Sequence, residues 1–156
     1  IERMVNAALS NGLTRFLTTE GGVNSGFMIV QYTAASMASE NKVLAHPACV
    51  DSIPSSANQE DFVSMGTTAA RKAGTILENT RSVLAYELLT ACQAIDIRRR
   101  SGEHGQGLSP AGEAVFRRVR EQVAFMEKDR ELWPDIQAVE AMVRSGELLE
   151  LVPWLS

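Results

Sequence analysis

Apolar side chains recur every three or four positions along most of this chain, which is the spacing of one face of an α-helix. The pattern predicts a helix within residues 1–9, a second from Phe27 to about Ala45, and a third from Gln59 to about Arg99. The third segment contains no proline and would be about 60 Å long at 1.5 Å per residue. A helix of that length exceeds the roughly 30 Å span of a small domain, so we expect it to find partners beyond this chain's own core.

Cap and breaker residues set the expected helix ends. One residue of the Asn24-Ser25 pair is expected to cap the second helix, and Pro47 should end it because proline interrupts helical hydrogen bonding. The Ser109-Pro110 pair predicts the start of a fourth helix that runs to about Met126, and a fifth is expected from Pro134 to near Gly146. Because no segment alternates apolar and polar residues as a strand would, the predicted fold class is all-α.

Composition and charge exclude several classes of protein. The chain has 156 residues, of which 45% are hydrophobic and 22% charged, and this suits one globular domain. Its net charge of −4 argues against a nucleic-acid partner, and the Arg98-Arg99-Arg100 run is better explained as cations at a helix C-terminus. Charged residues interrupt every apolar stretch before the roughly 20 residues that cross a bilayer, so no membrane partner is expected.

The two cysteines, Cys49 and Cys92, lack the spacing of a metal motif and are too few for a secreted disulfide scaffold. We therefore expect a reducing compartment and a cytoplasmic location. The chain begins with Ile1 in the middle of an amphipathic segment, without a charged and then apolar signal segment. This beginning suggests a piece of something longer.

The run from Ser56 to Gly66 carries the candidate chemistry, because it places Glu60 and Asp61 where the third helix is expected to start. Backbone N–H groups and the helix dipole favour an acidic side chain or an anionic ligand there. Adjacent helical residues point about 100° apart, so both carboxylates cannot face one site. From the pattern alone, two first-turn acids that only stabilise the helix are favoured over a group that transfers protons.

Histidine positions give no indication of a metal centre. His46 lies before Pro47 at an expected helix end, and His104 lies in a glycine-containing loop. Neither has a second histidine or a cysteine at ligand spacing, so we expect no metal site. The glycine-rich segments follow no predicted strand, which argues against a phosphate loop or a dinucleotide-binding fingerprint.

Five stretches of specific sequence follow one another in the first half of the chain. They are Asn11-Gly12-Leu13 through Phe16-Leu17, Gly21-Gly22-Val23-Asn24-Ser25-Gly26-Phe27-Met28, Ala38-Ser39-Glu40-Asn41-Lys42-Val43-Leu44-Ala45-His46-Pro47, Val50-Asp51-Ser52, and the run from Ser56 to Gly66. In this order they closely resemble the C-terminal portion of the histidine ammonia-lyases, within the family of aromatic amino-acid lyases and aminomutases. The resemblance is strong from residue 1 to about 99 and continues more loosely through Asp129-Arg130 and Pro134-Asp135-Ile136.

The resemblance implies an all-α fold of the aspartase-like type, in which long helices assemble into a tetramer around a shared helix bundle. Residues 1–100 would be the C-terminal part of the central helix-bundle domain, which carries the Gln-Glu-Asp motif. Residues 101–156 would be a C-terminal helical extension. Such an assembly would supply partners for the unusually long third helix.

The chemistry implied by the resemblance is elimination of ammonia from an amino acid, which for L-histidine gives urocanate. The family activates its substrate with methylidene-imidazolone, an electrophile made from an Ala-Ser-Gly tripeptide, while a base removes a proton from the β-carbon. The glutamate of Gln-Glu-Asp maps onto Glu60, a candidate for proton transfer or amine contact, with Gln59 beside it in the substrate site. Because phenylalanine and tyrosine lyases carry glutamine at the position of Glu60, this residue favours the histidine type.

This sequence departs from the family pattern at two points. The histidine enzymes usually follow Gln-Glu-Asp with histidine, but here Phe62 stands in this substrate-binding position, and a phenyl ring cannot hydrogen-bond an imidazole. A tyrosine or phenylalanine lyase, or an aminomutase, is therefore an alternative.

The second departure is that Ala-Ser-Gly is absent from the sequence: Ala35-Ser36 precedes Met37, and Ala38-Ser39 precedes Glu40. The electrophile would have to come from a missing N-terminal part or a companion chain. A non-catalytic helical assembly module is the other alternative.

Overall fold

The computed structural model describes residues 1–102 and 107–152. Its regular elements are α1 (Glu2–Val5), the short 3₁₀ helix η1 (Arg15–Leu17), α2 (Met28–Leu44), the 3₁₀ turn η2 (Ser56–Asn58), α3 (Gly66–Arg100), α4 (Pro110–Arg120), α5 (Trp133–Ser145) and α6 (Glu147–Glu150). Within the described ranges every regular element is helical, and only two isolated bridge pairs resemble a strand. The prediction of an all-α fold is confirmed.

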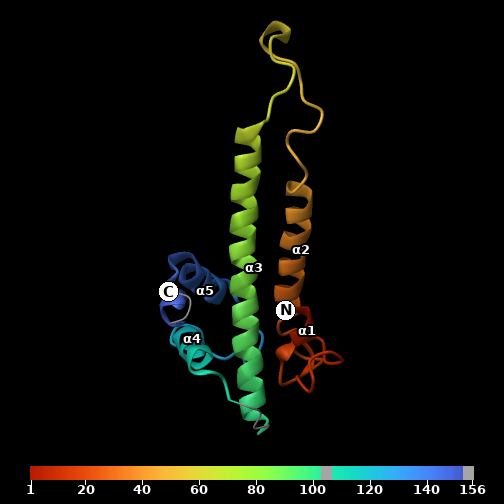
Figure 1. Cartoon of the computed structure of the whole chain (residues 1–156). Coiled ribbons are helices and arrows are strands. Elements are labelled where there is room, and N and C mark those ends of the chain that lie inside the picture. Colours follow the sequence, from red (N-terminus) through yellow and green to blue (C-terminus); the bar gives the residue numbers. More distant parts are fainter. Residues whose placement is uncertain (103–106, 153–156) are drawn as a thin grey trace.

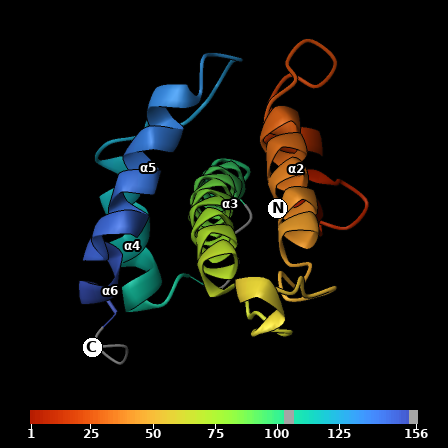
Figure 2. The ribbon, with the colours of Figure 1, turned by 90° about the horizontal axis from the view of Figure 1, so that it is seen from above.

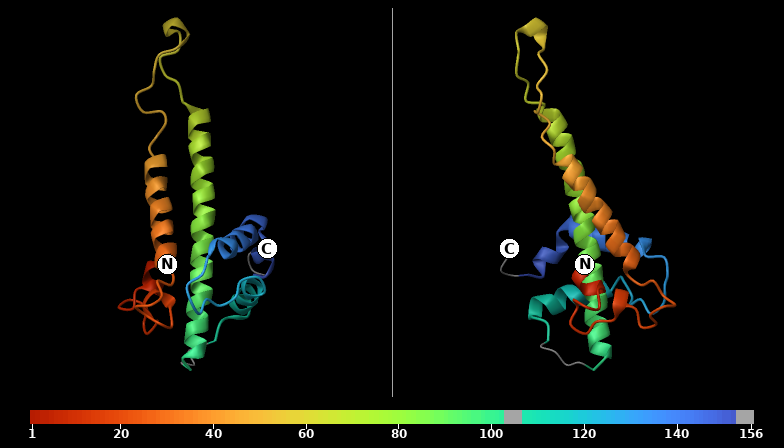
Figure 3. Two further views of the ribbon diagram at one scale, coloured as in Figure 1. Left: turned by 180° about the vertical axis from the view of Figure 1, so that it is seen from behind. Right: turned by 90° about the vertical axis from the view of Figure 1, so that its right-hand side faces the viewer.

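The elements form layers around α3, which is the longest helix and the axis of the molecule. Helix α2 lies along one side of α3, while α4 and α5 pack on the other side (Figure 1). Seen from above, α3 stands between the α2 layer and the layer of α4, α5 and α6 (Figure 2). The loop that joins α2 to α3, residues 45–65, extends past the ends of both helices (Figure 3). We call this loop the arm.

The hydrophobic core occupies only the half of the molecule that lies away from the arm. All buried residues of α3 fall between Ala85 and Ile97, and those of α2 are Val30 and Ala34. They form one cluster with buried residues of the C-terminal segments, namely Phe116, Val119, Val123, Met126, Val139 and Met142. The single cluster shows that the segments before and after residue 100 share one core.

The half of α3 nearer to the arm, residues 66–84, has no buried side chain. Leu77 and Leu84 are 50% and 48% exposed there. Polar contacts hold this half against α2: Asn79 Nδ2 donates to Glu40 Oε2 at 2.7 Å and to Asn41 Oδ1 at 3.0 Å. Although α3 has 35 residues, neither it nor any other helix in the described ranges is long and apolar enough to cross a membrane.

Helix α3 begins at Gly66, so the prediction that it starts at Gln59 was wrong by seven residues. Its N-cap residue, Met65, has a left-handed backbone with φ 49° and ψ 36°, which cannot continue a right-handed helix. The predicted end near Arg99 is confirmed, because the helix ends at Arg100. Glu60 and Asp61 are consequently not first-turn acids of this helix.

The expected cap of α2 was also wrong. Its N-cap residue is Phe27, which makes no side-chain cap hydrogen bond. Asn24 Oδ1 instead accepts from the backbone N–H of Asp129 at 3.1 Å. The Asp129 carboxylate in turn accepts from the backbone N–H groups of Ser25 and Gly26, at 2.7 and 2.9 Å. The Asn24 side chain and the backbone of Ser25 and Gly26 therefore make contacts that span about a hundred residues of sequence.

The predicted end of α4 near Met126 was wrong, because the buried Gln93 side chain hydrogen-bonds the backbone of Met126. Helix α4 ends at Arg120. Gln93 of α3 accepts from the N–H of Met126 at 3.1 Å and donates to its carbonyl at 2.8 Å. Gln93 Nε2 also donates to the Leu17 carbonyl at 3.2 Å. This one amide joins α3, the segment after α4 and the N-terminal η1.

Other predicted helix ends are confirmed, with one exception at the start of the chain. Ser109 Oγ accepts from the N–H of Gly112 at 3.1 Å, so it caps α4. Helix α5 has proline in its first turn and ends before Gly146, whose left-handed φ of 79° suits glycine. The helix predicted within residues 1–9 is confined to the four residues of α1.

The basic run at the end of α3 contacts the chain's own C-terminal segments. Arg99 pairs with Glu113 at 2.5 Å and Arg100 with Glu127 at 2.9 Å. The guanidinium of Arg100 also lies 3.7 Å from the ring centroid of Phe125. These contacts account for two of the three arginines within the fold.

Candidate functional site

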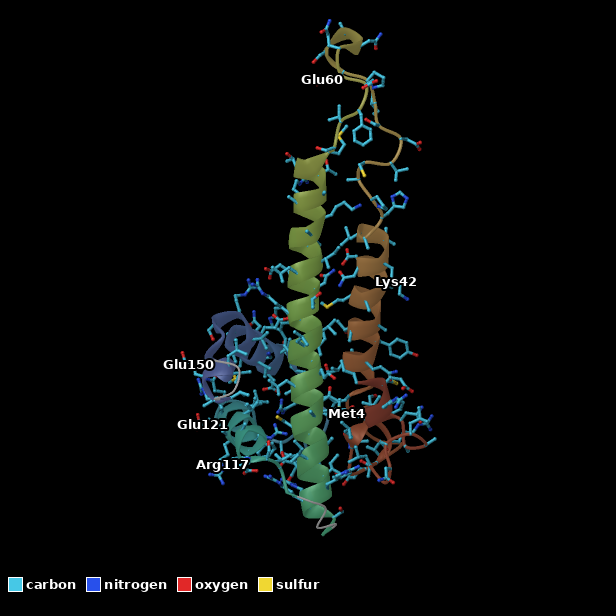
Figure 4. All side chains as sticks on the ribbon, in the orientation of Figure 1. Met4, Lys42, Glu60, Arg117, Glu121 and Glu150 are labelled. Atoms are coloured by element: carbon cyan, nitrogen blue, oxygen red, sulfur yellow. The ribbon has the colours of Figure 1, made fainter. Side chains whose placement is uncertain are left out.

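The predicted site residues lie at the tip of the arm, far from the core. Figure 4 shows Glu60 at the end of the molecule opposite Met4, Arg117 and Glu121. Gln59, Glu60 and Phe62 are all exposed, and Phe62 retains 70% of its accessible surface. This chain alone therefore presents these side chains outward and does not enclose a substrate with them.

The tip reverses direction through three consecutive residues with left-handed backbone. Ser56, Ala57 and Asn58 have φ angles of 53°, 53° and 68°. For residues other than glycine, this conformation costs about 1–2 kcal/mol each. Such backbones persist where the surrounding structure requires them and are concentrated at functional sites. The turn brings Ser55 opposite Glu60.

Ser55 and Glu60 are joined by backbone and side-chain hydrogen bonds. The Ser55 N–H donates to the Glu60 carbonyl at 2.8 Å, and the Glu60 N–H donates to the Ser55 carbonyl at 3.3 Å. The Ser55 hydroxyl donates to Glu60 Oε2 at 3.1 Å. The other carboxylate oxygen of Glu60 has no hydrogen-bond partner within the described part of the chain. One oxygen is thus held and the other is available to a ligand.

Two further contacts hold the arm below its tip, one between its two sides and one to α3. Ser52 Oγ accepts from the Val63 N–H at 2.7 Å. Nearer the helices, Lys72 Nζ of α3 donates to the carbonyl of His46. Sequence periodicity indicated none of these contacts, because an arm of this kind has no repeating apolar pattern.

The stretch from Gly21 to Met28, which contains Asn24, lies near the core end of the molecule. Gly26 has φ +55°, and a Cβ there would lie 2.3 Å from the Phe16 carbonyl oxygen, so only glycine fits. A cavity of about 230 Å³ adjoins this turn, and its lining includes Arg15, Thr18, Asn24 and Met28. Glu60 lies at the opposite end of the molecule (Figure 4), so the structure does not bring this turn and Glu60 together.

The described residues contain no group of three or more histidine, cysteine, aspartate or glutamate side chains that could hold a metal ion. His46 is exposed and its Nδ1 lies 3.1 Å from the Pro47 carbonyl oxygen, while His104 lies outside the described residues. Cys49 is exposed and Cys92 is buried. Burial raises the pKa of the Cys92 thiol to about 11, so this group is protonated at neutral pH.

Comparison with known proteins identifies the family. The model of the aromatic amino acid lyase family matches residues 1–121. Histidine ammonia-lyase of Natranaerobius thermophilus is 60% identical over 149 residues, covering 96% of this chain and 28% of the relative. Histidine ammonia-lyase 1 of Fusobacterium nucleatum is 54% identical over 152 residues, covering 97% of this chain and 29% of the relative.

Solved structures agree with the sequence relatives. The crystal structure of histidine ammonia-lyase from Trypanosoma cruzi superposes with a TM-score of 0.89 at 45% identity, covering 99% of this chain and 29% of that one. Tyrosine aminomutase from Streptomyces globisporus gives a TM-score of 0.88 at 37% identity over the same shares. The chain thus spans less than a third of the length of the proteins that it matches. It belongs to the aromatic amino acid lyase family.

Proposed function

We propose that this chain is the C-terminal portion of an ammonia-lyase that eliminates ammonia from L-histidine and releases urocanate. The observation that carries the proposal is the 52–60% identity to histidine ammonia-lyases, which extends over 96–100% of the chain. The presence of Glu60 within Gln-Glu-Asp, where lyases for other aromatic amino acids carry glutamine, supports the same substrate.

Glu60 is the proposed catalytic residue, with Gln59 and Phe62 in contact with the substrate. The structure removes the competing interpretation of Glu60 as a helix-capping acid, because α3 begins only at Gly66. A carboxylate with one oxygen held by Ser55 and one without a described partner suits a base that accepts a proton from the substrate β-carbon. Removal of that proton accompanies loss of ammonia and leaves the carbon–carbon double bond of urocanate.

The methylidene-imidazolone group of this family would have to come from residues outside this chain, because the sequence contains no Ala-Ser-Gly. When present, the group supplies the electrophile that activates the amino acid. The outward-facing Glu60 carboxylate suits a position beside such a group, since it is held on one side only. An N-terminal part of the same protein or a companion chain is the proposed source.

We further propose a tetrameric assembly in which residues 1–100 belong to a shared helix bundle and residues 101–156 form an extension. The half of α3 next to the arm supports this assembly, because it has no buried side chain and exposes Leu77 and Leu84. Partner helices along this half would bury that apolar surface. They would also bring other residues to the exposed tip at Glu60.

A cytoplasmic location is proposed from the cysteines. Cys49 and Cys92 are unpaired in the structure, and Cys92 is buried in its reduced form. Unpaired thiols are the expected state in a reducing compartment.

The second candidate function is that of a tyrosine or phenylalanine lyase or an aminomutase. Phe62 favours it, because its exposed phenyl ring, two residues after Glu60, suits the phenyl or phenol ring of those substrates and cannot hydrogen-bond an imidazole. The TM-score of 0.88 to a tyrosine aminomutase shows that the same fold occurs in an enzyme with that name.

A substrate panel separates the two candidates. The complete enzyme that contains this chain is incubated with histidine, phenylalanine or tyrosine, and both α,β-unsaturated acids and β-amino acids are quantified. We expect urocanate from histidine as the dominant product. A higher kcat/KM with tyrosine or phenylalanine, or a β-amino acid product, would favour the second candidate.

A further inference from the structure

We infer that Ser55 is a positioning residue for Glu60, whose carboxylate it orients from within the same arm. The inference rests on the proposed catalytic function of Glu60 and assigns part of that function to a hydroxyl that touches the carboxylate directly. The Ser55 Oγ donates to Glu60 Oε2 at 3.1 Å. This is the one side-chain contact of the Glu60 carboxylate within the described residues.

The backbone of the tip places the hydroxyl in register with the carboxylate. Ser55 and Glu60 exchange two backbone hydrogen bonds, of 2.8 and 3.3 Å, across the turn. The three left-handed residues between them, Ser56 to Asn58, provide the reversal that makes this pairing possible. A turn in which several successive residues have an unfavourable φ is retained only where its geometry is required. Here the geometry brings one hydroxyl to one carboxylate.

The Ser55 hydroxyl restricts the orientation of the Glu60 carboxylate. A glutamate side chain has three rotatable bonds, and an exposed one samples many rotamers. A hydrogen bond from Ser55 selects rotamers in which Oε2 contacts this hydroxyl, and it leaves Oε1 without a partner among the described residues. A base acts efficiently only when its oxygen lies within hydrogen-bond reach of the proton that it removes. Preorganisation by Ser55 would therefore affect the chemical step more than substrate binding.

The lower part of the arm keeps this arrangement in place. Ser52 Oγ accepts a hydrogen bond from the Val63 N–H at 2.7 Å, and Lys72 Nζ of α3 donates one to the His46 carbonyl. The first contact joins the two sides of the arm, and the second joins the start of the arm to α3. The side chain of Ser55 is exposed, so its replacement removes no part of the hydrophobic core.

The test compares three variants of the complete enzyme. Ser55→Ala removes the hydroxyl, and Ser55→Thr retains it on a backbone of φ −136° and ψ 178°, which a β-branched residue readily adopts. Ser64→Ala is the matched control, because Ser64 lies exposed on the same arm and its hydroxyl makes no hydrogen bond within the described residues. Steady-state kcat and KM for histidine are measured for each.

We expect Ser55→Ala to lower kcat about tenfold with KM changed less than about twofold. Ser55→Thr should restore most of kcat, and Ser64→Ala should match the parent enzyme. An unchanged kcat in Ser55→Ala, or an equal loss in Ser55→Thr, would overturn the inference.

Glu60→Gln distinguishes failure of this inference from failure of the proposed function. If Glu60→Gln abolishes turnover while Ser55→Ala does not, Glu60 is catalytic and only the role of Ser55 is rejected. If Glu60→Gln retains full turnover, the proposed function of Glu60 itself is rejected. Adding Ser55→Ala to Glu60→Gln should not lower the residual kcat further, because the Ser55 hydroxyl would act only through the Glu60 carboxylate.

Discussion

Gln93 and Met126 exchange two hydrogen bonds, in which the Gln93 amide both accepts from the Met126 N–H and donates to the Met126 carbonyl. The side chain is 1% exposed, so water cannot replace either bond. With its third bond, to the Leu17 carbonyl, Gln93 connects segments that are far apart in the sequence. A buried amide that satisfies three backbone groups specifies how these segments dock.

Gln93→Leu should lower the free energy of unfolding of the chain by about 3 kcal/mol, because three buried backbone groups lose their partner. Urea denaturation followed by circular dichroism measures the change. Gln137→Leu, at an exposed position of α5, is the control and should alter stability by less than about 0.5 kcal/mol. Equal effects of the two substitutions would contradict the role of Gln93.

Gly26→Ala should be strongly destabilising, by about 3 kcal/mol, because the new Cβ would lie 2.3 Å from a backbone oxygen and φ is +55°. Gly74→Ala is the matched substitution in α3, where a Cβ meets nothing within 4 Å. It should stabilise the isolated chain by about 0.5–1 kcal/mol. Thermal denaturation of both variants checks the opposite signs, and a stabilising Gly26→Ala would contradict the close approach of Gly26 to the Phe16 carbonyl.

Asp129→Ala should release the turn that precedes α2. Its carboxylate accepts from the N–H groups of Ser25 and Gly26, so both amides should exchange with deuterium at least about tenfold faster in the variant. Hydrogen exchange followed by NMR reports each amide separately. Glu131→Ala, at an exposed neighbouring position, should leave the two rates unchanged. Unchanged exchange in Asp129→Ala would mean that the carboxylate does not hold the turn.

The chain should lose stability at high pH through Cys92. Burial raises the pKa of its thiol to about 11, above the 9.0 of a free thiol, so the folded chain binds the proton more tightly than the unfolded chain. The stabilisation from this group is complete below about pH 9 and is lost as the pH rises through about 11, by about 3 kcal/mol in total.

Cys92→Ala should therefore lose less stability than the parent chain between pH 8.5 and pH 11. Urea denaturation at both pH values measures the difference. Burial also raises the pKa of Tyr86, but this residue titrates in both proteins and its effect cancels in the comparison. Parallel losses in the two proteins would show that the thiol is not protected by burial.

The sequence pattern predicted helices where the determining interactions are local. Ser109 with Pro110 marks the start of α4, and the proline in the first turn of α5 marks that helix, because cap and ring geometry act within one turn. The pattern failed where a distant residue decides. The end of α4 depends on Gln93, and the backbone before α2 depends on Asp129.

At the candidate site, too, the sequence predicted some features and missed others. The resemblance singled out Glu60, but helical periodicity placed it in a first turn, since nothing local excludes helix between Gln59 and Met65. The left-handed turn at Ser56 to Asn58 and the Ser55 hydroxyl were not foreseen, because none of these residues is glycine. We propose that residues outside this chain form the rest of the site.

The central claim is that this chain supplies the catalytic base of a histidine ammonia-lyase. Its most direct test is production of urocanate from histidine by this chain assembled with the N-terminal part of a family member that contains Ala-Ser-Gly. Urocanate formation is followed by its ultraviolet absorbance for the parent chain, for Glu60→Gln, and for Glu131→Gln as an exposed control. We predict turnover with the parent and control chains and a loss of at least about 100-fold with Glu60→Gln. Equal turnover in all three assemblies would contradict the claim that this chain supplies the catalytic base.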